Sequence, residues 1–214
     1  MANRDIDLMA HLLRRAGFGA SRDEVESRVG QGYENVVEEL LNVGEGPGVD
    51  EDLMYRAYPS YFDKAAIETG QTEWVYRMIN NRYQLQEKMS LFWHTVFCSG
   101  DNKVDNARTT AIQIDKFREE GMGNFRDLIL MLSKDPAMLY YLDNIESHKE
   151  SVNENYGREL LELFSMGVGK DGELNYSEDD VKACARAFTG WNLAPTIPVF
   201  PYGRTPFEFR YDPA

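Results

Sequence analysis

The stretch TEWVYRMINNRYQLQEKMSLFWHTVF, residues 72–97, carries the longest helical pattern in the chain. Its apolar side chains recur at intervals of three, four or seven residues, and they are Trp74, Met78, Leu85, Met89, Phe92 and Val96. This spacing gathers them on one face of a helix. The stretch therefore predicts one continuous helix whose apolar stripe packs on the core.

The opposite face of this helix is formed by Glu87, Leu91, His94 and Cys98. A helix with two such faces is expected to lie between neighbouring helices, which places His94 in a partly buried position near Glu87. A histidine oriented by a carboxylate can act as a general base or bind a metal. A core histidine whose hydrogen bonds are satisfied gives the same pattern, and the sequence leaves both interpretations open.

Signals for further helices flank this stretch on both sides. Ser177 with Asp180 has the spacing of a capping box, and Asp135-Pro136 is typical of a helix start. The whole pattern predicts an all-α fold, a single compact multi-helix domain of about seven to nine helices over residues 1–194.

The remaining residues, 195–214, form a tail rich in proline and aromatic residues, without helical periodicity. Within it, Phe207–Tyr211 alternates apolar and charged residues as a half-buried strand does. One strand cannot satisfy its own backbone groups. We therefore expect an irregular tail that can form a strand and that begins a remainder of the chain missing here.

Composition limits the classes of partner. The chain has 23 basic and 36 acidic residues, a formal net charge of −13, which repels phosphate backbones and anionic lipid surfaces. No apolar run reaches the roughly 18–20 residues of a membrane helix. We therefore predict no nucleic-acid partner and no membrane partner.

The N-terminus and the cysteines point to a cytoplasmic location. The first residues have no basic segment followed by an apolar one, so they do not form a secretory signal. Cys98 and Cys184 are too few for a disulfide framework in a chain of 214 residues. Their apolar or small neighbours predict buried free thiols.

A second group of polar candidates lies on the helix expected over residues 153–165. Its apolar face is expected to consist of Tyr156, Leu160 and Leu163. On another face, Glu154, Arg158 and Glu162 form a surface ladder at i, i+4 and i+8.

Glu159 lies at the border of that apolar stripe, with Asn155 and Glu162 on its outer side. A carboxylate in such a position needs a donor or has a raised pKa. One interpretation is a polar site made of these three residues, joined by His94. The other is a structural network in which an arginine or a helix-end amide neutralises Glu159.

Four segments match, in order and spacing, the pattern of a known family. They are residues 11–19 (HLLRRAGFG), 87–94 (EKMSLFWH), 135–144 (DPAMLYYLDN), and 153–163 with 187–191 (NENYGRELLEL, AFTGW). Together they resemble the bacterial family called domain of unknown function 1800 (DUF1800), over almost the whole chain. The resemblance implies a longer protein and assigns no activity. Many relatives carry export signals and are encoded beside exported sulfatase-like proteins, which implies a protein partner of that kind.

Metal and cofactor signals are weak. The chain has three histidines and no pair of Glu-x-x-His motifs for a di-metal site. The loop after Ser165 resembles a calcium loop, but Gly167 and Gly169 stand where its first carboxylates belong. We therefore predict no metal and no cofactor. Trp191, at the end of the last expected helix, is either a packing anchor or a platform for a substrate.

Two functions follow as hypotheses, and the residues leave open whether the protein is an enzyme. The first, which we favour, is a structural or interaction module in which polar residues hold helices in register. The alternative is an enzyme or ligand-binding domain, hydrolase-like, with a polar pocket formed by the His94 and Glu159 helices. In that case the catalytic candidates are His94, Glu159 and Glu162, and the binding candidates are Asn155, Arg158 and Trp191.

Overall fold

The computed structural model describes residues 3–44, 48–59, 64–198 and 205–212. In these ranges lie α1 (Asn3–Ala16), α2 (Arg22–Gln31), α3 (Tyr33–Leu41), α4 (Glu51–Ala57), α5 (Ile67–Asn80), α6 (Gln84–Val96), α7 (Asp101–Val104), α8 (Ala107–Glu120), α9 (Phe125–Ser133), α10 (Pro136–Tyr141), α11 (Asn155–Glu159) and α12 (Glu178–Ala187). The all-α class is confirmed. These twelve helices exceed the expected seven to nine, because one expected helix is divided and the short α4 and α7 were not predicted.

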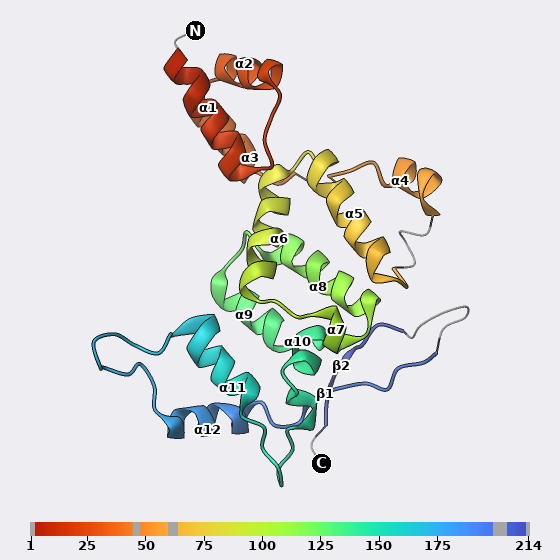
Figure 1. Cartoon of the computed structure of the whole chain (residues 1–214), viewed down its shortest axis with the longest axis vertical. Coiled ribbons are helices and arrows are strands. Elements are labelled where there is room, and N and C mark those ends of the chain that lie inside the picture. Colours follow the sequence, from red (N-terminus) through yellow and green to blue (C-terminus); the bar gives the residue numbers. More distant parts are fainter. Residues whose placement is uncertain (1–2, 45–47, 60–63, 199–204, 213–214) are drawn as a thin grey trace.

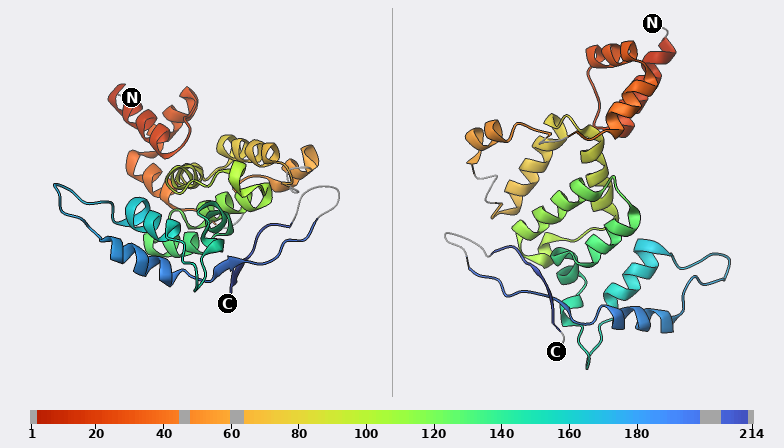
Figure 2. Two further views of the ribbon diagram at one scale, coloured as in Figure 1. Left: turned by 60° about the horizontal axis from the view of Figure 1, so that its bottom comes forward. Right: turned by 180° about the vertical axis from the view of Figure 1, so that it is seen from behind.

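Helices α1–α3 form a unit at one end of the molecule, and α5, α6 and α8 occupy its middle (Figure 1). In both further views the α1–α3 unit projects from the rest (Figure 2). It has its own apolar cluster, built on Met9, Leu13, Val25 and Val36, and it reaches the remainder through contacts of α1 and α3 with α6. The larger cluster is formed by buried side chains of α8, α9, α10 and α11, together with Phe97 just after α6 and Phe164 after α11. That residues 1–194 form a single domain stays a prediction.

The predicted continuous helix over 72–97 is wrong, because the chain turns at Asn81 between α5 and α6. The Asn81 side chain accepts the backbone N–H of Tyr83 at 2.9 Å, and the backbone N–H of Arg82 donates to the carbonyl of Gly48 at 3.0 Å. Asparagine competes with helical hydrogen bonds in this way. The turn folds α5 back against α6 and α8.

The burial of α6 agrees with the prediction on the face of Glu87 and His94 and differs from it on the apolar stripe. Phe92 and Val96, expected in the core, are 50% and 38% exposed, whereas Glu87 and Ser90 are fully buried. Glu87 is tolerated because Arg118 of α8 donates to its Oε1 at 2.6 Å and Asn81 donates to the same oxygen at 2.7 Å. A charged residue of α6 is thus buried because a residue of another helix, Arg118, neutralises it, and the apolar periodicity of α6 alone does not show this.

This pair belongs to a longer series of ion pairs that ties the middle of the molecule together. We call it the ion-pair chain, and it comprises Arg77, Glu73, Lys64, Asp115, Arg118 and Glu87. Lys64 lies 3.0 Å from both Glu73 and Asp115. The series connects α5 and α8 to α6 and to the segment before α5.

Predicted helix starts are confirmed where they depend on local contacts. Ser177 and Asp180 form the full capping box of α12. Asp135 caps α10, with Pro136 at the first position, and its Oδ1 accepts the N–H of Met138 at 3.0 Å.

The helix expected over 153–165 has two parts. After α11 the chain forms a π-helix, η3 (Leu160–Ser165). Because the wider turn rotates the following side chains, Phe164 is buried while Leu163, expected in the apolar face, is 64% exposed. Insertions of this kind are frequent at functional sites.

The tail has a partner strand, contrary to the expectation. Strand β1 (Trp191–Leu193) pairs antiparallel with β2 (Phe209–Tyr211). The tail also reaches α8, where the Thr109 hydroxyl accepts the N–H of Phe207 at 2.7 Å, and Tyr140 stacks on Phe207 with ring centroids 5.3 Å apart. Residues 199–204 and 213–214 of the tail lie outside the described ranges.

Candidate functional site

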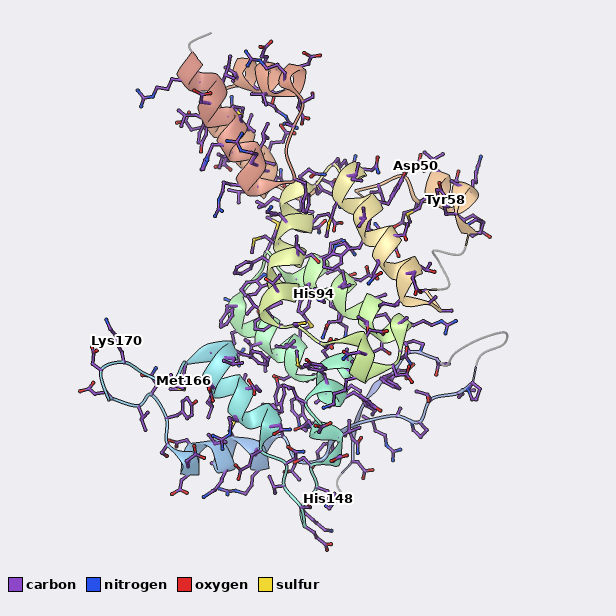
Figure 3. The ribbon with its side chains drawn as sticks, viewed as in Figure 1. Asp50, Tyr58, His94, His148, Met166 and Lys170 are labelled. Atoms are coloured by element: carbon purple, nitrogen blue, oxygen red, sulfur yellow. The ribbon has the colours of Figure 1, made fainter. Side chains whose placement is uncertain are left out.

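A pocket of about 280 Å³ lies between α5, α6, α7 and α8. We call it the His94 pocket. Its lining is mostly apolar, with a few polar groups, and includes Trp74, His94, Cys98, Asp101, Thr110 and Ile114. Figure 3 shows His94 in the middle of the molecule, where these helices meet.

Trp74 and His94 meet here because the chain turns at Asn81. In one continuous helix the two residues would be about 30 Å apart, since each residue adds about 1.5 Å. In the structure their ring centroids are 5.2 Å apart, with the rings nearly perpendicular. The pair was not predicted from the sequence, because only the helix break brings the two rings together.

Each of the two rings has a buried nitrogen without a hydrogen-bond partner among the described residues. These atoms are Nε1 of Trp74 and Nδ1 of His94. An unpaired buried polar atom costs about 1–3 kcal/mol. Such atoms are uncommon in folded proteins, and among the described residues three others occur away from this pocket, on Glu87, Asp135 and Asn144.

His94 is held as a neutral imidazole. Burial lowers its pKa below the usual 6.5. Unlike Nδ1, its Nε2 atom is not among the buried unpaired atoms, and no hydrogen bond to it occurs in the described part of the chain, so Nε2 is the nitrogen that a ligand can reach. A neutral imidazole can there donate or accept a hydrogen bond.

The lining of the pocket also includes a thiol, Cys98, and a carboxylate, Asp101. Cys98 is exposed, so the prediction of a buried thiol at this position is wrong. It lies just beyond the end of α6, where the helix no longer covers it. The Asp101 carboxylate receives a hydrogen bond from the Thr110 hydroxyl at 3.4 Å.

Glu159 and Glu162, the other catalytic candidates, do not line the His94 pocket. Burial, followed by repulsion from Glu162, raises the pKa of Glu159, and within the described ranges no side chain forms an ion pair with it. Glu162 instead accepts a hydrogen bond from the Tyr176 hydroxyl at 3.4 Å. The segments of His94 and Glu159 do touch, but through Phe97 and Phe164, whose ring centroids are 5.3 Å apart.

The binding candidates lie apart from the pocket as well. Arg158 forms ion pairs with Glu154 at 3.3 Å and with Glu178 of α12 at 2.8 Å, so the ladder exists in part, with Glu178 in place of Glu162. Asn155 is exposed. Trp191 is packed edge-on between Phe188 and Phe209, at 5.0 and 5.4 Å between centroids.

A larger cleft, of about 660 Å³, lies between the α1–α3 unit and α5. Its charged lining is already engaged, since Arg28 donates to Glu39 at 2.5 Å. Neither of the unpaired ring nitrogens lines it, so it offers less chemistry than the His94 pocket.

Within the described ranges, no three or more histidine, cysteine, aspartate or glutamate side chains are grouped as a metal ion requires. In the same ranges, no helix has the length and apolarity needed to cross a bilayer.

Comparison with known proteins identifies a family. The family described as "Protein of unknown function (DUF1800)" matches residues 11–214. No curated protein and no solved structure matches the chain.

Proposed function

The chain belongs to the DUF1800 family of proteins of unknown function, and within that family we propose that it is a domain that binds a small molecule in the His94 pocket. The observation that carries this proposal is a mostly apolar cavity whose wall holds the adjacent rings of Trp74 and His94, with Nε2 of His94 left without a hydrogen-bond partner among the described residues. An apolar pocket with a few convergent polar groups and a shifted pKa is the usual form of a ligand site.

The role of each side chain follows from its position. Trp74, Ile67 and Ile114 supply apolar surface for the body of a ligand. His94 offers a neutral nitrogen that can hydrogen-bond to it, or move a proton if the ligand reacts. Catalysis by Glu159 and Glu162 is a separate proposal, since these residues lie outside this pocket.

The test uses benzyl alcohol as a probe, because it combines an aromatic ring with one hydroxyl. Its binding is followed by the NMR signal of the Trp74 indole N–H, assigned with Trp74→Phe. We expect a saturable shift with a Kd near 1 mM, about −4 kcal/mol. The probe should also slow alkylation of Cys98 by iodoacetamide, whereas alkylation of the half-buried Cys184 should not change.

A variant that fills the cavity provides the control. Gly70 lines the pocket, and a Cβ added there would lie 3.8 Å from that of Ala111, an ordinary contact. Gly70→Leu should therefore abolish both effects, while Gly30→Leu, on α2 with open space around it, should preserve them. An absent shift, or one that survives in Gly70→Leu, would refute the proposal.

A structural or interaction module is the second candidate, and separate observations favour it. The ion-pair chain holds α5, α6 and α8 together, and Phe92 of α6 and Phe125 of α9 leave apolar surface exposed. On this hypothesis the Trp74 signal does not respond to any probe, and Phe92→Ser lowers affinity for a protein partner. The net charge of −13 supports a partner other than nucleic acid. A sulfatase-like partner and a cytoplasmic location stay predictions.

A further inference from the structure

A second cavity lies next to the His94 pocket. This neighbour, of about 320 Å³, shares Ile67, Asp101 and Ala107 with it. The first cavity is lined mainly by apolar groups, and the second adds Asp105, Asn106 and Arg108. Because three lining residues are common to both cavities, we consider them as two lobes of one candidate site, an apolar lobe at Trp74 and a polar lobe beyond Asp101.

The polar lobe has an excess of negative charge. Asp101 and Asp105 have no ion pair with any residue in the described part of the chain, and the hydrogen bond from Thr110 to Asp101 is long, at 3.4 Å. Lys103, between them on α7, turns away to Asp143 at 2.7 Å. Arg108 also lines the lobe and already has an interaction partner.

These observations lead beyond the binding of an unspecified small molecule. Resting on the proposed function, we propose that the ligand is an amine with an apolar or aromatic body, whose body fills the lobe at Trp74 and whose ammonium group lies at Asp101 and Asp105. The reason to expect a ligand here is independent of the two carboxylates, because it comes from the mostly apolar cavity beside Trp74 and from Nε2 of His94, which has no hydrogen-bond partner among the described residues.

The chemistry of the two lobes disfavours the other simple ligand classes. An ammonium group donates up to three hydrogen bonds and is attracted by two carboxylates. A carboxylate ligand would be repelled by the same two groups, and Arg108, which also lines the lobe, is already engaged with a partner. A neutral apolar ligand would leave the carboxylates unused and gain nothing from the polar lobe.

Three probes of similar shape separate these classes. They are 2-phenylethylammonium, neutral 2-phenylethanol and anionic 3-phenylpropionate, each titrated into the whole protein at neutral pH with the Trp74 indole signal as the readout. We expect the ammonium probe to bind about tenfold more tightly than the alcohol, which corresponds to about 1.4 kcal/mol. The anion should bind most weakly.

Two variants assign the preference to the carboxylates. Asp101→Asn should reduce the tenfold preference for the amine to about twofold or less, with the affinity for 2-phenylethanol unchanged. Asp105→Asn tests the second carboxylate in the same way. Asp105 has a φ of 49°, a conformation that asparagine tolerates, so the variant should keep the local backbone. Asp127→Asn on α9, an exposed carboxylate away from the site, is the matched control and should keep the full preference.

The outcomes distinguish the two proposals. Equal binding of amine and alcohol in the unmodified protein overturns the amine class and leaves the binding pocket intact. The amine class is overturned as well if the preference survives in both Asp101→Asn and Asp105→Asn. If no probe shifts the Trp74 signal and none slows alkylation of Cys98, the proposed function itself fails, and the amine class with it.

Discussion

At the scale of single residues, the buried imidazole of His94 makes stability depend on pH. Because burial lowers its pKa, the unfolded chain takes up a proton at a higher pH than the folded protein does. The stability is therefore full above the unfolded pKa of 6.5 and falls as the pH drops through 6.5 towards the folded pKa.

We expect calorimetry to show a smaller loss of thermal midpoint between pH 7.5 and pH 5.5 in His94→Gln than in the unmodified protein. His11, exposed on α1, provides the control, and His11→Gln should keep the full loss. An equally steep loss in His94→Gln would show that other groups cause the pH dependence.

The two glutamates Glu159 and Glu154 should respond in opposite ways to loss of charge. The pKa of Glu159 is raised by burial and by Glu162, so its ionised form is disfavoured in the fold and Glu159→Gln should keep or raise stability, by up to about 0.5 kcal/mol. Glu154→Gln loses its ion pair with Arg158 and should lower stability by a similar amount. Thermal melts at pH 7 test both, and a large loss in Glu159→Gln would identify it as a structural anchor.

At the scale of helices, what could be predicted from the sequence depended on the range of the interactions. The capping box of Ser177 and Asp180 is local and was predictable. The turn at Asn81 uses a carbonyl from Gly48, and the burial of Glu87 requires Arg118, which periodicity within one helix does not reveal. His94 was therefore identified as a candidate from the sequence, whereas its neighbour Trp74 was not.

The buried pair of Glu87 and Arg118 gives a test at the same scale. Arg118→Met leaves Glu87 without its cation and should lower stability by about 3–5 kcal/mol. In the double variant with Glu87→Met, part of that loss should return, because no buried charge is left unpaired. Arg56→Met, which breaks the exposed pair with Asp52, should change stability by less than about 1 kcal/mol. A double variant less stable than Arg118→Met would contradict this account.

For Gly70 we predict a substitution that raises the stability of the protein. It lies within α5, and its added Cβ would meet Ala111 at an ordinary distance. Gly70→Ala should raise stability by about 0.5–1 kcal/mol, because alanine has the higher helix propensity. Denaturant unfolding measures this gain, and a loss would show that the pocket wall cannot accept a methyl group.

At the scale of the whole molecule, the tail and the helices depend on each other. The alternation of Phe207–Tyr211 predicted a strand correctly, but its partner, β1, lies before the tail and directly follows the last helical segment. The paired residues are 16 to 20 positions apart, and the three residues of β1 are too few for a recognisable alternating pattern of their own, so the strand looked unpaired. The contacts of the tail with α8 and α10 were hidden as well, because they span much longer stretches of chain, 98 positions from Thr109 to Phe207.

Removing residues 205–214 should therefore destabilise the helices and not merely shorten the chain. The deletion takes away β2, the stacking of Phe207 on Tyr140, and the hydrogen bond from Asn106 to the carbonyl of Thr205. Thr109→Val removes only the acceptor for the N–H of Phe207 and should cost about 1–3 kcal/mol. Thr72→Val, whose hydroxyl bonds only within α5, is the matched control. Circular dichroism melts should place the midpoint of the truncated protein below that of Thr109→Val, and an unchanged midpoint would mean that the helices fold without the tail.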